Sequence, residues 1–387
     1  MVSVKPLPVA TPLLDDESIS SWLLRVSLNQ GCDLSTILFY HWSKYNLRHH
    51  DFDKGFHHIN KQIHQDMAVL AQTDTKFFDN RSLIQFNEDI GLEYRPNISL
   101  TWVLPIPKFH SKTMVGHQYC AQCMQEDKSA YLRLKWRFSW IVYCEQHLIS
   151  LQSSCSSCGL PYQPHLIKAN HRFINRCPHC REKLSAEAVN QLLCTDAYEF
   201  QLKAEQVLSA NQAIVFGHSI TSGDWFELTL FFINLIRKST LEKELIYKNL
   251  VETLGICGID GLRLSKTRTG LKFDYLSYEE RVMLIAYANQ MLKIKFDDWL
   301  LACKKNNLTQ NSFRLGKRPI IPKAFLPIYN ELPSAVKRQI KANRISAKPK
   351  SARAVNNSWE RMQLRIEKLK IYDKSKPNKR ARRATKS

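Results

Sequence analysis

Eight cysteine and histidine residues in the middle of the chain share one spacing. They form four pairs with two residues inside each pair: Cys120 and Cys123, Cys144 and His147, Cys155 and Cys158, and Cys177 and Cys180. A two-residue gap lets a tight turn direct both side chains at one tetrahedral ion, and two such turns complete a four-coordinate zinc site. The pattern therefore predicts two structural Zn2+ ions per chain.

Two arrangements of these pairs use the same eight residues. Gaps of twenty residues between Cys123 and Cys144, and of eighteen between Cys158 and Cys177, suit a sequential arrangement. That arrangement gives a site of three cysteines and one histidine, followed by a site of four cysteines. A crossed arrangement would join the first pair to the third. Either one leaves no open metal position, which is typical of structural sites and not of hydrolytic ones.

An aromatic and basic stretch, residues 131–143, separates the first two pairs. Its apolar residues alternate with Arg133, Lys135 and Arg137, as in a strand, while Trp136 and Trp140 also stand at helical spacing. Either reading gives one aromatic face and one basic face. We expect the aromatic side chains to fill a core beside the zinc sites; base stacking is the alternative.

Positive charge is concentrated at the C-terminal end. The 387 residues contain 56 Lys and Arg against 35 Asp and Glu, and residues 336–387 alone contain 18 against 3. An excess of this size favours an anionic partner, with nucleic acid as the first candidate. The best candidates for phosphate contacts in this tail are Lys379, Arg380, Arg382 and Arg383.

The same tail divides into two parts. Residues 355–372 keep apolar side chains, Trp359 among them, at three- and four-residue steps, which predicts a basic amphipathic helix. The residues beyond it repel one another and are expected to be disordered in isolation. A solubilising tail without a specific partner is the alternative.

Two helix-turn-helix-like units are predicted outside the cysteine region. In the first, Ser18 caps a helix that ends at Gly31, and Asp33 caps a second helix. In the second, at 278–316, two helices precede a turn at Asn306 and Asn307 and a third short helix. If that third helix reads DNA, the residues suited to base edges are Gln310, Asn311 and Arg314, and those suited to phosphates are Lys317 and Arg318. A scaffold or protein-docking role for these helices is the alternative.

The predicted fold is mainly α, with two small zinc-finger modules inserted between helix-turn-helix-like helical domains. We expect an N-terminal helical domain at 1–116, the tandem zinc fingers at 117–185, a C-terminal helical domain at 186–335, and the basic helix and tail at 336–387. Hydrophobic residues make up 44% of the chain, which is enough for a core.

Several functional classes are disfavoured. Asp297 and Asp298 beside Trp299 do not form a convincing two-metal set, and Gly316-Lys317-Arg318 fails the phosphate-loop pattern, so we expect no enzyme. The longest apolar stretch, 225–236, is too short to cross a bilayer. The N-terminal residues do not form a signal peptide. We therefore expect a cytoplasmic, nucleoid-associated protein.

The motifs together resemble the TniQ/TnsD family of transposition target-selection proteins. The resemblance begins with Leu7-Pro8 and the Glu17–Arg25 segment, continues through Tyr119-Cys120-x-x-Cys123 and the stretch around Trp136, and extends over Cys144-x-x-His147 to Cys158. It covers about 1–185 closely and the helical remainder more loosely. The combination is specific, although each motif alone is not.

The resemblance implies a non-enzymatic adaptor that recruits an AAA+ (TnsC-like) regulator, which engages the transposase on target DNA. At this length the chain looks like the TniQ of CRISPR-associated transposons. There, a head-to-tail homodimer docks on the type I Cascade complex that carries the guide RNA. The alternatives are a direct sequence-specific DNA reader, as in TnsD, and a zinc-containing transcription regulator.

Overall fold

The computed structural model describes residues 5–45, 47, 50–55, 60–79, 81–94, 99–106, 116–185, 193–241, 244–256, 272–315, 320–334, 351–353, 355–357 and 359–363. The chain forms two compact units, Met1–Ser334 and Ala335–Ser387. The division between them lies beside the boundary expected at 335–336. The boundaries expected inside the first unit stay predictions.

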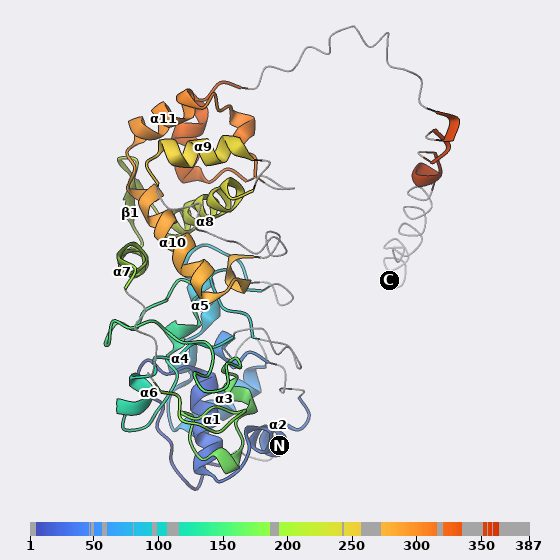
Figure 1. Ribbon diagram of the computed structural model, residues 1–387. Helices are drawn as coiled ribbons and strands as arrows, with labels where there is room; N and C mark the ends of the chain where they lie inside the picture. Colours follow the sequence, from blue (N-terminus) through green and yellow to red (C-terminus); the bar gives the residue numbers. More distant parts are fainter. Residues whose placement is uncertain are drawn as a thin grey trace, which may run out of the picture. The chain divides into compact units, whose positions relative to one another are not determined.

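The first unit consists mainly of helices (Figure 1). Its α-helices are α1 (Ile19–Asn29), α2 (Leu34–Trp42), α3 (Lys61–Ala71), α4 (Thr75–Asp79), α5 (Leu83–Asp89), α6 (Cys123–Glu126), α7 (Thr195–Ala210), α8 (Ser222–Ser239), α9 (Leu245–Thr253), α10 (Tyr278–Lys293), α11 (Phe296–Lys305) and α12 (Leu326–Glu331). An antiparallel hairpin, β1 (Ala213–Val215) and β2 (His218–Ile220), pairs Ala213 with Ile220. These elements confirm the expected mainly α fold with two cysteine-rich clusters.

The N-terminal helices form where their apolar spacing predicts, but of the two predicted caps only Ser18 is present: Asp33 makes no side-chain hydrogen bond to the start of α2 and accepts one from the Ala169 amide instead. The Ser18 hydroxyl accepts a hydrogen bond from the Ser21 amide at the start of α1, and Gly31 has a positive φ of 70° after its end. One face of α1, including Trp22, packs into a separate core with α2 and α3. On α2, Ile37 and Leu38 are buried, whereas the neighbouring Tyr40 is exposed.

The C-terminal helices pack around α8 and α10. A capping box between Ser277 and Glu280 starts α10, which packs against α7 and α8 (Figure 1). Phe232 of α8 stacks on Trp299 of α11 with 5.1 Å between ring centroids. The helices expected at 278–316 are therefore present as α10 and α11.

The third element of that predicted unit is shorter than expected. Residues Gln310–Phe313 form a single 3₁₀ turn, closed by a capping box between Thr309 and Ser312. Its buried Phe313 packs against Phe325, with 5.0 Å between ring centroids, and the chain then leaves the helical conformation at Arg314. The expected third short helix is therefore present only as one 3₁₀ turn, which ends where Phe313 packs into the core.

The stretch 131–143 is neither a regular strand nor an α-helix. It contains a 3₁₀ turn at Leu134–Arg137 and single bridges from Arg133 to Glu17 and from Phe138 to Val103. Trp136 and Trp140 are buried, which confirms that the aromatic residues fill the core. The prediction of a basic face is wrong in part, because Arg133 and Arg137 are also buried and pair with carboxylates.

One aromatic core connects the middle of the first unit to its C-terminal helices. Phe226 of α8 lies 5.4 Å from Trp102 and 6.0 Å from Trp140 between ring centroids.

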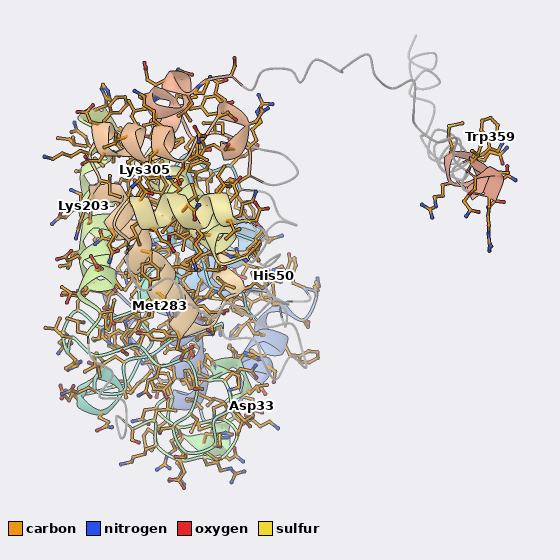
Figure 2. The ribbon with its side chains drawn as sticks, turned by 45° about the horizontal axis from the view of Figure 1, so that its top comes forward. Asp33, His50, Lys203, Met283, Lys305 and Trp359 are labelled. Atoms are coloured by element: carbon orange, nitrogen blue, oxygen red, sulfur yellow. The ribbon has the colours of Figure 1, made fainter. Side chains whose placement is uncertain are left out.

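In the second unit, the described residues between 352 and 363 are helical, and Trp359 is exposed on them (Figure 2). No helix among the described residues is long and apolar enough to span a membrane.

Candidate metal centres and nucleic-acid surface

The first cluster brings together Cys120, Cys123, Cys144 and His147, with all four ligand atoms within 4.8 Å of one another. The Sγ atoms of Cys123 and Cys144 are 3.6 Å apart, and His147 Nδ1 lies 3.3 Å from Cys123 Sγ. Zinc–sulfur bonds of about 2.3 Å in a tetrahedral site would separate two sulfur atoms by about 3.8 Å. The donor set and its spacing therefore fit zinc.

The second cluster brings together Cys155, Cys158, Cys177 and Cys180 in the same way, again within 4.8 Å. Sγ–Sγ distances of 3.7 Å join Cys155 to Cys180 and Cys158 to Cys177. The grouping is sequential, first pair with second and third with fourth. The structure thus chooses between the two arrangements that the spacing left open.

Three of the four turns share one backbone geometry. In each, the first ligand's carbonyl accepts from the amide of the residue after the second ligand: Leu148, Gly159 or Arg181. That residue has a positive φ of 55°, 69° or 69°, respectively. The first ligand's amide donates in turn to the carbonyl five residues ahead, at 2.9 Å in all three turns. This repeated hairpin aims both side chains inward, and it explains why a gap of two residues recurs.

The turn at Cys120 and Cys123 differs, because it opens a helix. The Met124 amide donates to the Cys120 carbonyl as in the other three turns, but here Cys123 is the first residue of α6. The Cys123 amide also donates a hydrogen bond to Cys120 Sγ at 3.5 Å. The first cluster therefore combines one helical turn with one hairpin turn, whereas the second uses two hairpin turns.

An acceptor behind the histidine completes the first cluster. Glu126, at the end of α6, places Oε2 2.9 Å from His147 Nε2. With Nδ1 directed at the three sulfur atoms, Nε2 carries the proton and donates it to this carboxylate, an arrangement typical of metal-bound histidine. Glu126 was not predicted from the sequence; its position three residues after Cys123 was the available signal.

The thiol environments are also those of a cation site. Burial raises the pKa of Cys177 to about 12. Burial also opposes ionisation of Cys155, but hydrogen bonds from the backbone amides of Cys158 and Ser157 and from the Cys180 and Cys177 thiols together lower its pKa to about 7. Four crowded thiols do not ionise together without a compensating charge, and a divalent cation supplies one.

A buried ion-pair cluster joins the N-terminal helices to the first cysteine cluster. Arg137 donates from Nη1 to Asp53 at 2.6 Å and from Nη2 to Asp51 at 2.9 Å, and it is almost completely buried. Asp53 also accepts from the amide and hydroxyl of Ser20 at the start of α1. Because the aspartates come from a distant 3₁₀ turn, Phe52–Lys54, and its flank, the sequence pattern did not reveal this burial of Arg137.

A basic surface surrounds the second cluster. We define it by five residues, none of which forms an ion pair with the described part of the chain: Lys168, Arg172, Arg176, Arg181 and Lys183. Phe173, next to Arg172, is 57% exposed. Cations beside an exposed aromatic ring are a combination that binds single-stranded nucleic acid.

The residues predicted to contact nucleic acid lie apart from this surface in sequence. Asn311 and Arg314 are exposed and Gln310 is half-buried, on and just after the 3₁₀ turn. A four-residue turn is too short to enter a major groove as a recognition helix does. Lys317, Arg318, Lys379, Arg380, Arg382 and Arg383 lie outside the described residues.

Comparison with known proteins gives one family. The TniQ family model matches residues 8–151, which contain the N-terminal helices and the whole first cluster but end before the second. No curated protein matches the chain. The match supports the TniQ family, and with it a transposition-associated adaptor or target-selection role for this part of the chain.

Proposed function

We propose that the protein is a non-enzymatic adaptor for guided DNA transposition. In this role a homodimer, arranged head to tail, binds a type I Cascade complex with its guide RNA and recruits the AAA+ TnsC-like regulator, which brings the transposase to target DNA. The TniQ match at 8–151 supports the transposition role. The finer assignment to Cascade rests on the sequence resemblance described above.

The outer face of α2 is the observation that favours an adaptor over a DNA reader. In a helix-turn-helix unit the second helix enters the major groove and carries polar or charged side chains to the bases. The exposed residues of α2 are Ser35, Thr36, Phe39 and Tyr40, none of them charged. Phe39 is 73% exposed and Tyr40 is 81% exposed. Two exposed aromatic rings on a helix whose exposed residues are uncharged suit a protein interface better than a phosphate backbone.

The two cysteine clusters support a binding role and not hydrolysis. Each provides four protein donors, so zinc bound there would have no open position for water or substrate. In this proposal Cys120, Cys123, Cys144 and His147 hold one Zn2+, and Cys155, Cys158, Cys177 and Cys180 hold the other. The metal would fix the loops that surround α1 and α2.

The alternative is a direct, sequence-specific DNA reader or a zinc-containing transcription regulator. The basic surface of the second cluster favours this alternative, because its five cations have no carboxylate partner in the described chain. In the adaptor proposal the same surface contacts RNA or the DNA backbone without reading sequence.

Reprogramming the guide tests the proposal. We expect insertions made with this protein, its AAA+ regulator and its transposase to follow each new guide sequence. Insertions at one fixed site whatever the guide would establish the direct reader. A preference of the purified protein for one duplex over random DNA by about a thousandfold or more would do the same.

A surface variant tests the role of α2. Phe39→Ser with Tyr40→Ser should lower recovery of the guide complex with the protein by about tenfold, since exposed aromatic residues dominate such interfaces. Leu245→Ser on α9, where the leucine is 63% exposed, is the matched control. Equal recovery with both variants would remove α2 from the interface.

A further inference from the structure

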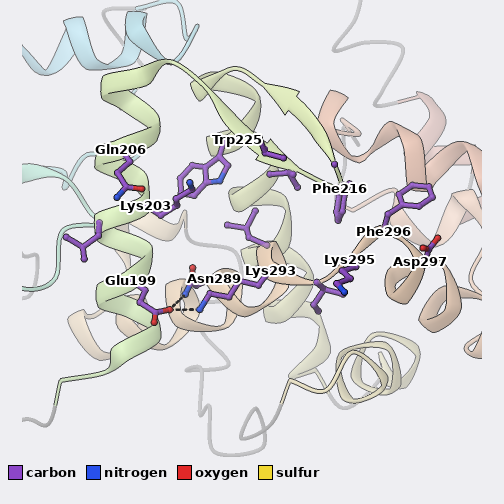
Figure 3. A pocket seen from close by; sticks show the side chains of 16 residues that line it. Glu199, Lys203, Gln206, Phe216, Trp225, Asn289, Lys293, Lys295, Phe296 and Asp297 are labelled. Atoms are coloured by element: carbon purple, nitrogen blue, oxygen red, sulfur yellow. Dashed lines mark hydrogen bonds and ion pairs between the residues drawn. The ribbon is translucent and has the colours of Figure 1, made fainter.

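A cavity of about 750 Å³ lies between α7, the β1–β2 hairpin and the start of α11 (Figure 3). We call it the hairpin groove. Its lining combines apolar and charged side chains, and the apolar residues that matter most are Leu202 of α7, Ile214 of β1, Phe216 of the hairpin turn and Phe296 of α11. It belongs neither to the cysteine clusters nor to the residues predicted to contact nucleic acid.

The apolar wall is open to solvent at the strand. Ile214 is 72% exposed, while Phe216 and Phe296 meet edge to face with 6.5 Å between ring centroids. Ile214 and the following Val215 both line the cavity, although side chains at successive positions of a strand point to opposite faces. The cavity is therefore reached along the edge of β1, and among the described residues this edge pairs with no other strand.

Some of the lysines that line the groove form ion pairs and others do not. Lys293 is paired with Glu199 and Asp196, and Asn289 also donates to Glu199 (Figure 3). Lys203 and Lys295 line the same cavity and form no ion pair with the described part of the chain.

Asp297 also lines the groove, but it lies in the first turn of α11. There the positive end of the helix stabilises its carboxylate. The lining therefore holds three lysines against two carboxylates, and the lysines without an ion pair in the described chain, Lys203 and Lys295, are available to an anionic group of a ligand.

We propose that the hairpin groove binds a short extended segment of a partner protein that carries a large apolar side chain beside a carboxylate. The strand edge offers backbone donors and acceptors, the apolar wall holds the side chain, and Lys203 or Lys295 pairs with the carboxylate. Nucleic acid fits less well, because two cations beside an apolar wall neutralise few phosphates.

This inference deepens the proposed function, since an adaptor needs a surface for each partner it joins. It does not depend on which partner is the guide complex. The groove lies in the region 193–297, outside the residues that match the TniQ family model, so it marks a partner that the family match does not account for.

Peptide selection tests the groove directly. Random displayed peptides of about twelve residues are selected on the full, zinc-loaded chain, and one enriched sequence is synthesised with a fluorescent label. We expect the enriched sequences to pair a large apolar residue with Asp or Glu. Ile214→Asp, and separately Lys203→Glu with Lys295→Glu, should each raise the Kd of the labelled peptide by about tenfold or more, since each removes one class of contact.

Matched variants control for general surface effects. Leu301→Asp, where the leucine is 66% exposed on α11, and Lys305→Glu at the end of that helix should leave the Kd unchanged. Four outcomes would overturn the inference: no enrichment, enrichment of basic peptides, equal binding to Ile214→Asp, or a change in oligomeric state in that variant. The last outcome would make a second copy of the chain the occupant.

The groove and the proposed function fail in different ways. If guided insertion does not occur with the unmodified protein, the proposed function fails, while peptide binding to the groove stands. If guided insertion occurs but the selected peptides ignore Ile214 and both lysines, only the groove inference fails.

Discussion

The two cysteine clusters use the same spacing but differ in how the protein holds them. The segment beside the first cluster is tied to the C-terminal helices. Gln201 of α7 accepts from the amides of Val142 and Tyr143, and the Tyr278 hydroxyl of α10 donates to the Val142 carbonyl. Residues beside the second cluster contact the N-terminal helices and α6 instead: the turn at Pro164–Leu166 packs against α1, the Ala169 amide donates to Asp33, and Asn175 donates to the Met124 carbonyl.

Burial follows the same division. All three cysteines of the first cluster are buried, whereas Cys158 and Cys180 of the second are half-buried. Both clusters contribute to the core that the C-terminal helices share, but the second is less buried and carries the basic surface. Spacing therefore predicts the donor atoms of a metal site, and the surroundings decide what the metal does for the fold.

The largest expected effect is the loss of the first cluster. Cys123→Ser should remove one zinc and melt the first unit as a whole, because bound structural zinc contributes folding free energy on the order of 10 kcal/mol. Cys180→Ser should also remove one zinc, but leave α7 to α11 folded. Zinc content and helical circular dichroism during heating measure both results. Equal melting of the two variants would abolish the distinction between the clusters.

The sequence predicted much of this site because its determinants are local. Ligand pairs two residues apart, the Ser18 cap and the apolar spacing of α10 all act within a few residues of one another. The burial of Arg137 could not be predicted in this way, since its partners Asp51 and Asp53 lie more than eighty residues away. The 3₁₀ turn at Gln310 was missed for a related reason, because the packing of Phe313 on Phe325 determines where it ends.

The next effect concerns Arg137, which attaches the first cluster's flank to the N-terminal helices. Arg137→Met leaves Asp51 and Asp53 without their counter-ion, and breaking a buried pair in this way costs about 3–5 kcal/mol. Lys135→Met is the control, since Lys135 pairs with Glu145 at a half-exposed position. Denaturant unfolding measures the two free energies of unfolding. Similar losses would mean that burial of the Arg137 cluster adds nothing.

A smaller effect is expected from the carboxylate behind His147. Glu126→Gln keeps the shape of the side chain but weakens the acceptor, and loss of such an acceptor lowers metal affinity by about 10- to 100-fold. Only the first cluster should be affected, because Glu126 bonds to His147. Competition with a zinc chelator measures both sites. Glu182→Gln, an exposed position beside the second cluster, should change neither; weaker binding at both sites in Glu126→Gln would contradict the assignment.

The link between the first cluster's flank and the 3₁₀ turn before α10, Phe273–Tyr275, should depend on pH. Asp274 accepts a hydrogen bond from Ser139 at 2.7 Å, with Lys272 and Arg281 nearby, and burial raises its pKa to about 6. The folded state then holds a proton that the unfolded state, with an ordinary aspartate, has released. The stabilisation is therefore complete below the unfolded pKa and is lost as pH rises through about 6.

Comparison with Asp274→Asn isolates this contribution. The unmodified protein should gain about 1 kcal/mol of unfolding free energy relative to the variant between about pH 7.5 and about pH 5.5. Taking the difference between the two proteins cancels the effect of acid on zinc binding. A constant difference across this range would mean that Asp274 is ionised throughout.

The smallest expected effect concerns the second cluster, where changing the surface charge should alter nucleic-acid binding and leave the stability of the fold unchanged. Arg172→Glu with Lys183→Glu reverses two cations of the basic surface, and neither residue pairs with a carboxylate of the described chain. If this surface contacts phosphates, the slope of log affinity against log salt should fall by about 1.4 to 1.8, because each contact with single- or double-stranded nucleic acid contributes about 0.7 to 0.9. Melting should be unchanged, since both side chains are exposed.

Two matched variants show whether a change in slope comes from the basic surface, from other exposed cations or from the tail. Lys128→Glu with Lys44→Glu reverses two exposed cations away from the second cluster and should leave the slope unchanged. Truncation after Tyr372 removes seven Lys and Arg residues and should lower the slope further, with the fold of the first unit intact. If only the truncation lowers the slope, the tail binds nucleic acid and the basic surface of the second cluster does not. If both act, the second cluster is the part of the first unit that meets nucleic acid, while the first cluster serves the fold.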